Sequence, residues 1–237
     1  MQELLRSIGI VCLYFIPLAL LAFILRFSIR VPNEIFRKIL HFILLGSMPV
    51  FVFVLDNWRL SALTAVTFAA VVYPVLMGME QIRSYSTVVT ERKKGELKSS
   101  LLLVFGMFAV VISICWGWLN DRWLALTSVY AWGIGDAFAA VIGKKFGTHK
   151  FRLKYVDPKK SVEGTAAMFL VSLLSVAVLL LCRGGLPAAG YLVIPVVTAA
   201  VSAAAELYSK NGMDTAICPM AAMTVLIPQI WLFGGVR

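Results

Sequence analysis

The sequence predicts an all-α, polytopic integral membrane protein, and three observations support that fold class. Of the 237 residues, 60% are hydrophobic and only 14% are charged, and the mean hydropathy is +0.88. Apolar stretches close to the ~20 residues that cross a hydrocarbon core recur along the whole chain. The basic residues concentrate in alternate connections between these stretches. We expect about eight transmembrane helices in a single membrane-embedded domain, 1–237.

The predicted spans follow the apolar stretches in chain order: 7–27, 36–55, 60–79, 99–119, 123–143, 162–182, 190–206 and 217–233. The first has the length of a span without a small-residue cleavage site after it, so we expect a retained helix. The seventh is short and Ala-rich and contains Pro195, which favours a close-packed, irregular or tilted span. The four cysteines lack Cys-x-x-Cys spacing, so neither a disulfide framework nor a zinc site is expected.

The distribution of lysine and arginine predicts the orientation of the chain. One set of alternate connections carries 17 of the 22 basic residues: Arg26, Arg30, Arg37, Lys38, Arg83, Arg92, Lys93, Lys94, Lys98, Lys144, Lys145, Lys150, Arg152, Lys154, Lys159, Lys160 and Lys210. The other set carries Arg6, Arg59, Arg122, Arg183 and Arg237. We therefore expect the first set to face the cytoplasm, in what we expect to be a bacterial plasma membrane, with both termini outside.

Most acidic residues fall on the same predicted face as the lysines, namely Glu34, Glu80, Glu91, Glu96, Asp136, Asp157, Glu163, Glu206 and Asp214. An anchor for anionic lipid would need only the lysines. Carboxylates among them favour a site that binds both a polyanion and a cation such as Mg²⁺.

Asp136 is the most informative of these carboxylates because it lies inside a predicted span. It precedes Gly143 by seven residues, which places it roughly 10 Å from the cytoplasmic end of its helix. Gly133, Asp136, Ala140 and Gly143 are spaced to share one helix face. Small residues alone would be explained by helix packing, whereas an ionisable group within a span indicates function.

The segment "GKKFGTHKFRLKYVDPKKSVEGTAAMF" follows directly and carries seven basic residues. Ser161 is the expected N-cap of the next helix. A helix N-terminus beside Lys159 and Lys160 is a natural seat for phosphate. The chain has no Walker A spacing, and "GIGDAF" fails the dinucleotide pattern, so soluble nucleotide-binding folds are excluded. No nucleic-acid partner is expected.

Four stretches resemble the CTP-dependent lipid-alcohol kinases, a family that includes dolichol kinase, phytol kinase and fungal CTP-dependent diacylglycerol kinase. They are "RKILHFILLG", "GDAFAAVIGKKFG", "KKSVEGTAAMF" and "AELYSKNGMDTAICP", in order between residues 30 and 222. The second and third stretches are the most specific. In the fourth, Thr215 stands where the family has Asn.

The resemblance implies transfer of the γ-phosphoryl group of CTP, or of another nucleoside triphosphate, to the hydroxyl of a membrane lipid alcohol with Mg²⁺ or another divalent cation. The acceptor could be a polyprenol, dolichol, phytol or diacylglycerol, and neither its identity nor the oligomeric state follows from the sequence. Two alternatives are a cytidylyltransferase that makes a CDP-lipid, whose usual His-Gly-Gly pattern is absent, and a small ion-coupled transporter. The one-sided charge argues against the transporter.

The role of each candidate residue follows from its charge and predicted depth. We expect Asp136, Lys160 and Glu163 to be catalytic, and Asp136, Glu163, Glu206 and Asp214 to be candidate metal ligands. Nucleotide contacts are expected from Arg37, Lys38, His41, Gly143, Lys144, Lys145, Gly147, Lys159, Ser161, Gly164 and Thr165. The alternative for Arg37 and Lys38 is a basic flank of a span, and for His41 a helix contact.

Overall fold

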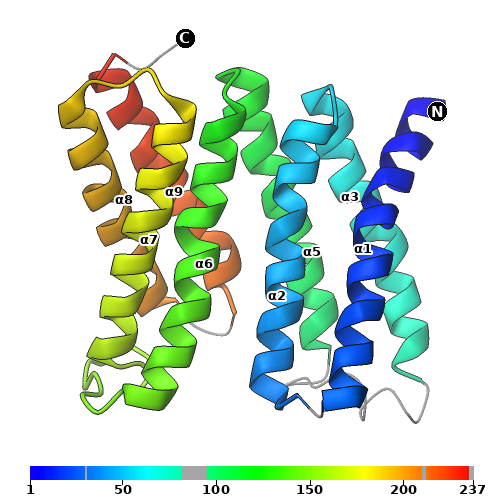
Figure 1. Cartoon of the computed structure of the whole chain (residues 1–237), viewed down its shortest axis with the longest axis horizontal. Coiled ribbons are helices and arrows are strands. Elements are labelled where there is room, and N and C mark those ends of the chain that lie inside the picture. The colour runs from blue at the N-terminus through cyan, green and yellow to red at the C-terminus, as the bar shows by residue number, and fades with distance from the viewer. Residues whose placement is uncertain (30, 82–94, 210–211, 235–237) are drawn as a thin grey trace. The chain divides into compact units, whose positions relative to one another are not determined.

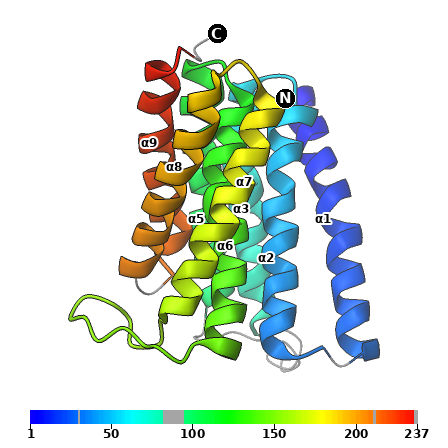
Figure 2. The ribbon, with the colours of Figure 1, turned by 60° about the vertical axis from the view of Figure 1, so that its left-hand side comes forward.

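The structure is a computed structural model that describes residues 1–29, 31–81, 95–209 and 212–234. Within these ranges the chain is helical, and the only β pairing is an isolated bridge between Lys150 and Ser161. The elements are α1 (Gln2–Ile29), α2 (Asn33–Pro49), η1 (Val50–Val54), α3 (Trp58–Met79), α5 (Glu96–Val111), η2 (Ile112–Trp118), α6 (Arg122–Phe146), α7 (Val162–Arg183), α8 (Ala188–Tyr208) and α9 (Asp214–Leu232). Figures 1 and 2 show long helices joined mostly by short connections.

Eight helices in the described ranges are long and apolar enough to cross a membrane. They coincide with the eight predicted spans, so the all-α polytopic fold class is confirmed. The seventh span differs in detail from the prediction, since α8 is one continuous helix of 21 residues around Pro195. Several expected loop residues lie outside the described ranges, namely Arg30, Arg83, Arg92, Lys93, Lys94, Lys210 and Arg237.

Two spans contain a wide helical turn that the sequence pattern did not predict. Residues Val50–Val54 and Ile112–Trp118 are π-helical. In the first segment the N–H of Leu55 bonds the carbonyl of Val50. Pro49 immediately precedes this segment, and proline has no N–H to continue an α-helical ladder. The periodicity of apolar residues is insensitive to one such widened turn.

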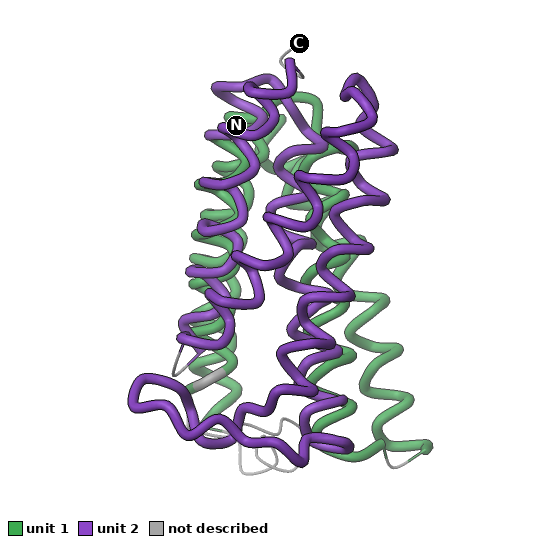
Figure 3. Tube along the Cα trace, turned by 90° about the vertical axis from the view of Figure 1, so that its left-hand side faces the viewer, with its two compact units in different colours: residues 1–113 green, residues 114–237 purple. Residues whose placement is uncertain are grey.

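The described chain divides into two compact units, residues 1–113 and 114–237, which Figure 3 colours separately. Each is described by itself below. The prediction of a single domain stays a prediction.

Unit 1 contains α1, α2, α3 and α5. Aromatic side chains make up much of its core, with centroid distances between 5.1 and 6.0 Å among Phe15, Phe51, Phe68, Phe105 and Phe108. Gly46 gives α1 its contact with α2, because a Cβ at that position would collide with the Tyr14 hydroxyl. That hydroxyl donates to the carbonyl of Ile43 at 2.8 Å.

Unit 2 contains α6, α7, α8 and α9, which pack α6 on α7, α7 on α8, α8 on α9 and α9 on α6. The C-termini of α6 and α8 and the N-termini of α7 and α9 lie toward one end of this unit (Figure 1). We call these four helix termini the charged end. At the opposite end, Arg183 Nε donates to Asp121 Oδ2 at 2.5 Å, and both side chains are largely buried.

The contact between α6 and α7 depends on small residues. A Cβ at Gly135 would lie 2.5 Å from Ser172 Oγ and 2.6 Å from Met168 Sδ, and one at Gly164 would lie 3.0 Å from the Ala139 carbonyl. The close-contact stripe of α6 is therefore Gly135, Ala139 and Gly143. Gly143 also belongs to the predicted small face through Gly133 and Ala140, and the rest of that face stays a prediction. Because each residue turns the helix by about 100°, Asp136 lies about 60° from Ala139, at the margin of the stripe.

Candidate functional site

Asp136 lies on α6 and is half-buried in unit 2. Its charge interacts with that of Glu206 near the end of α8, and so does the charge of Asp214 at the start of α9. The buried Cys218 on α9 lies within electrostatic range of the same three carboxylates. The charges of three of the four predicted metal ligands, from three different helices, therefore act on one another at the charged end, and their role in metal binding stays a prediction.

Lys160 is the cation of this group. Its Nζ lies 2.9 Å from Glu206 Oε1, and it donates to the backbone carbonyls of Glu206 and, at 3.1 Å, of Ser209. The side chain of Lys160 is 18% exposed and that of Glu206 is 12% exposed. Lys160 thus joins the start of α7 to the C-terminus of α8, where carbonyl groups lack helical partners and favour a cation. We call Asp136, Lys160, Glu206 and Asp214 the charged cluster.

Glu163 does not belong to the charged cluster. It lies in the first turn of α7, and its Oε1 accepts from Thr148 Oγ1 at 2.6 Å and from the backbone N–H groups of Thr148 and His149 at 3.2 and 3.1 Å. The ring Nδ1 of His149 lies 2.7 Å from the same oxygen. The side chain therefore fixes the turn after α6. Its expected roles in metal binding and catalysis remain predictions.

The predicted N-cap of α7 is confirmed. Ser161 has extended backbone angles, and its Oγ accepts from the N–H of Gly164 at 3.2 Å. The N–H of Val162 donates to the His149 carbonyl at 2.9 Å. These amides thus have partners within the protein, and Ser161 is only 2% exposed. A phosphate contact by this terminus, including Thr165, stays a prediction.

The three predicted glycine contacts with nucleotide have a packing explanation in this structure. A Cβ at Gly143 would lie 3.2 Å from Ser161 Oγ and 3.4 Å from the Cα of Gly164, and one at Gly147 would collide with the Gly143 carbonyl. Gly143, Gly147 and Gly164 therefore let α6, the following turn and the start of α7 approach closely. Their role in nucleotide binding stays a prediction.

A basic hairpin connects α6 to α7 and extends beyond these helices (Figure 2). Backbone hydrogen bonds pair its two arms, from Val162 to His149 and from Phe151 to Lys160. Asp157 Oδ1 accepts from the N–H of Lys159 at 2.9 Å and stabilises the turn. Exposed cations lie along the hairpin and the preceding turn of α6: Lys144, Lys145, Lys150, Arg152, Lys154 and Lys159. This arrangement can attract a polyanion from solution.

The remaining predicted contacts, Arg37, Lys38 and His41, lie on α2 in unit 1. Arg37 Nη1 lies 3.3 Å from Glu34 Oε2 within the same helix, and the His41 ring stands 6.1 Å from that of Phe42. Both side chains are half-buried. Because Arg37 and His41 lie four residues apart in α2, they share one helix face, as the sequence predicted.

The described residues contain no ready-made cluster of three or more His, Cys, Asp or Glu side chains that could hold a metal ion. Mg²⁺ is commonly bound by one or two carboxylates together with substrate phosphates and water. Asp136 and Asp214 carry carboxylate oxygens, the hard donors that such a site requires, and Glu206 pairs with Lys160. The donor set therefore fits a cation that arrives with a nucleotide.

Sequence reasoning missed the partners of two predicted residues. Thr148 and His149 bind Glu163, and the Ser209 carbonyl binds Lys160. The first joins residues 14 and 15 positions apart across a turn, where neither charge nor spacing indicates a hydrogen bond. The second joins residues 49 positions apart, and no local pattern indicates it.

Comparison with known proteins adds two relatives. The chain is 27% identical over 242 residues to a protein named phytol kinase from Synechocystis sp., with 97% of this chain and 94% of the relative covered. It is 29% identical over 161 residues to a probable chloroplastic phytol kinase of Triticum aestivum, with 63% of this chain and 50% of that relative covered. No family model and no solved structure matches the chain. The chain is thus similar to a phytol kinase over nearly its whole length, which supports the resemblance to the lipid-alcohol kinases.

Proposed function

We propose that the protein is a lipid-alcohol kinase that transfers the γ-phosphoryl group of a nucleoside triphosphate, CTP in the first instance, to the hydroxyl of a membrane alcohol. The observation that carries the proposal is the charged cluster, in which carboxylates from α6, α8 and α9 interact electrostatically and Lys160, two residues before α7, pairs with Glu206 beside a basic hairpin. The names of the two relatives agree with this activity.

The reaction needs charge neutralisation and alignment more than covalent chemistry by the protein. The alcohol oxygen forms a bond to the γ-phosphorus, the bond from that phosphorus to the bridging oxygen breaks, and the nucleoside diphosphate leaves. The hydroxyl proton must pass to a base. Asp136 is the candidate, because it is half-buried in the interior of α6, whereas Asp214 is the first residue of α9 and Glu206 is paired with Lys160.

A divalent cation would neutralise phosphate charge when bound, and Asp136 and Asp214 are the residues that would hold it. Lys159, Lys150 and the lysines at the end of α6 would attract the triphosphate, since all of them are exposed. Lys160 would keep the ends of α7 and α8 in register through its contacts with Glu206 and Ser209.

The positive-inside distribution of lysine and arginine supports a cytoplasmic location of the charged end. Soluble nucleotide would then reach the basic hairpin from the cytoplasm, while the lipid alcohol would reach the cluster from the bilayer. A water-soluble nucleotide and a lipid alcohol can meet only where the bilayer borders the cytoplasm.

The test is phosphate transfer from γ-labelled CTP, ATP, GTP and UTP by the purified protein in lipid nanodiscs, with Mg²⁺ and with phytol, geranylgeraniol, dolichol or diacylglycerol. We expect a labelled lipid with CTP and its loss on chelation of the cation. Asp136→Asn should lower the rate at least ~100-fold, as expected on removal of a general base or metal ligand. Asp56→Asn, an exposed carboxylate between η1 and α3, is the matched control and should retain the rate.

Two results would contradict the proposal. Labelling by wild type and Asp136→Asn at equal rates would remove Asp136 from the mechanism. Formation of pyrophosphate from CTP and phosphatidate, without a labelled lipid from any alcohol, would identify a cytidylyltransferase instead.

A further inference from the structure

Two hydroxyl groups inside unit 2 have no hydrogen-bond partner among the described residues. They belong to Thr198 and Ser202, one turn apart on α8, and both side chains are fully buried, at 0% exposure. The other buried serine and threonine hydroxyls in the described chain are bonded within the protein. A buried hydroxyl without a partner carries its full desolvation cost, so these two positions call for a polar neighbour.

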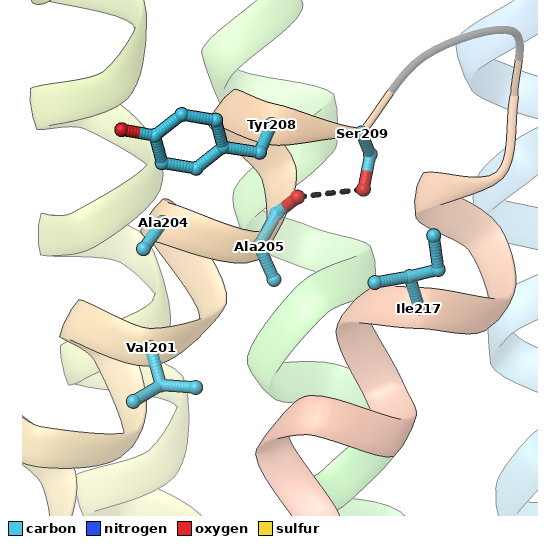
Figure 4. Close-up of a pocket in the computed structure, with 6 residues that line it drawn as sticks. All are labelled: Val201, Ala204, Ala205, Tyr208, Ser209 and Ile217. Atoms are coloured by element: carbon cyan, nitrogen blue, oxygen red, sulfur yellow. Dashed lines mark hydrogen bonds between the residues drawn. The ribbon is translucent and has the colours of Figure 1, made fainter. Parts of the chain in front are cut away.

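The usual partner of such a hydroxyl is a carbonyl of its own helix, four residues earlier. Ser209, at the C-terminal end of α8, follows this pattern, because its hydroxyl donates to the Ala205 carbonyl at 2.6 Å (Figure 4). Thr127 on α6 also donates to the carbonyl four residues earlier, at 2.7 Å. Thr198 and Ser202 depart from the pattern, so bonding within their own helix does not satisfy them.

The two hydroxyls belong to a row of polar groups on the buried face of α8. Glu206 lies one turn after Ser202 on the same side of the helix. In the other direction, Pro195 has no N–H, so the Tyr191 carbonyl lacks the helical donor that residue 195 would otherwise provide. We call the Tyr191 carbonyl and the side chains of Thr198, Ser202 and Glu206 the polar row. Its three side chains extend over roughly 12 Å of the helix.

The polar row lies on the side of α8 that faces the other helices of unit 2. The buried side of α8 packs against α7 and α9 and also contacts α6. At the charged end, the charge of Glu206 interacts with those of Asp136, Asp214 and Lys160. The charged cluster thus has three acidic groups and one basic group, and a polar molecule held along α8 would help to solvate it.

We propose that the polar row binds internal water, which hydrogen-bonds the hydroxyls of Thr198 and Ser202 and connects them to Glu206. Water suits the site because it both donates and accepts, and because one molecule needs only ~10–15 Å³ and two to four polar partners. An apolar occupant would leave both hydroxyls unsatisfied. The site hydrates the charged cluster from within the bundle.

Radiolytic labelling tests for this water directly. Brief X-ray irradiation of the full-length protein in nanodiscs generates hydroxyl radicals from water, including water held inside the protein, and modified side chains are mapped by mass spectrometry. We expect modification of the buried Ile194, one turn before Thr198, to exceed that of the equally buried Leu124 and Leu126 several-fold. The hydroxyls beside those two leucines are bonded within α6. Equal modification of Ile194 and the leucines would overturn the proposal.

Thr198→Val removes one hydroxyl and keeps the shape of the side chain. The variant should lose most of the modification at Ile194 and lower the unfolding temperature by about 2–4 °C, as for one lost hydrogen-bonded contact in a chain of this size. Thr127→Val is the matched control, equally buried in the same unit, and should leave the modification at Ile194 unchanged. Ser202→Ala repeats the test one turn nearer to Glu206.

Two further results would contradict the water site. A higher unfolding temperature in Thr198→Val would show that the native hydroxyl has no partner at all, because an apolar group of the same shape avoids its desolvation cost. Modification of Ile194 that persists in both Thr198→Val and Ser202→Ala would place the water away from the polar row. Neither measurement uses phosphate transfer, so the water site and the kinase proposal stand or fall separately.

Discussion

Lys160 is the residue on which the geometry of the charged end most depends. Its ammonium group contacts one carboxylate and two backbone carbonyls of a helix 46 or more positions away. Burying Glu206 without a cation would leave an uncompensated charge, which costs far more than an exposed ion pair contributes. Lys160 therefore stabilises the site as well as supplying positive charge to it.

Lys160→Met should destabilise the folded protein by about 3 kcal/mol, in the range for removal of one partner of a buried pair. Glu206→Gln should cost less, about 1 kcal/mol, because the lysine keeps its two carbonyl partners. The double variant Lys160→Met/Glu206→Gln should be more stable than Lys160→Met alone, because it leaves no unpaired buried charge. Unfolding in detergent micelles, analysed as a double-mutant cycle, measures the coupling. Additive effects would show that the pair contributes nothing.

At the residue scale, the sequence predicted the roles that depend on a residue's own charge or on its immediate neighbours in the chain. Ser161 was identified as an N-cap because a polar residue immediately precedes an apolar run, and the structure confirms it. Lys160, Glu206 and Asp214 were identified by charge and depth, and the structure brings them together with Asp136. The partners of Glu163 were not identified, because hydrogen bonding across a turn leaves no mark in charge or spacing.

At the scale of elements, α6 and α7 pack closely because glycine residues at their interface have no side chain. Gly135 faces Ser172 and Met168, while Gly164 faces Ala139 and Gly143. The Ser172 hydroxyl crosses the interface and donates to the Ala131 carbonyl at 2.5 Å. Such close backbone approach is a common basis of helix association in membranes, where apolar burial alone does not favour one helix neighbour over lipid.

Gly135→Ala should destabilise unit 2 by about 1–3 kcal/mol, because the new methyl group would overlap Ser172 Oγ and Met168 Sδ. Gly106→Ala on α5 is the matched control. It has open space for a Cβ, so the variant should be neutral or more stable by about 0.5–1 kcal/mol through helix propensity. Thermal unfolding of both variants in the same detergent tests the pair, and equal effects would refute the packing argument.

The elements themselves were predictable because hydrophobic length is a strong signal for a membrane helix. The predicted small-residue face of α6 included Gly143 but neither Gly135 nor Ala139, which also pack against α7. The spacing of small residues fits more than one stripe of a helix, and the position of α7 shows that Gly135, Ala139 and Gly143 make close contacts. The π-helical turns were unpredictable for a similar reason, since one extra residue per turn hardly changes a run of apolar side chains.

At the scale of the whole molecule, each unit by itself segregates its described cations. In unit 1 the ends of α1 and α3 and the starts of α2 and α5 carry Arg26, Arg37, Lys38 and Lys98. In unit 2 the charged end and its hairpin carry Lys144, Lys145, Lys150, Arg152, Lys154, Lys159 and Lys160. These described cations lie at the helix ends that charge counting over alternate loops assigned to one side, and the cytoplasmic identity of that side stays a prediction.

Cysteine accessibility in intact bacterial cells measures that side. In a background with the four native cysteines replaced, Ala188→Cys at the start of α8 should react with a membrane-impermeant maleimide, whereas Lys150→Cys in the hairpin should react only after lysis. Both positions are exposed in the structure. The reverse pattern would invert the proposed orientation.

The Asp121–Arg183 ion pair has a consequence for membrane insertion. Its two residues flank the α6–α7 helical hairpin at the end opposite the charged end, and both are largely withdrawn from solvent. Under the proposed orientation both must be translocated across the bilayer, where a lone arginine is costly. If the two side chains cross the bilayer as a neutral ion pair, Arg183 no longer acts as a positive charge that retains the loop in the cytoplasm. The Asp121→Asn variant should then translocate the α6–α7 hairpin less efficiently than the native protein.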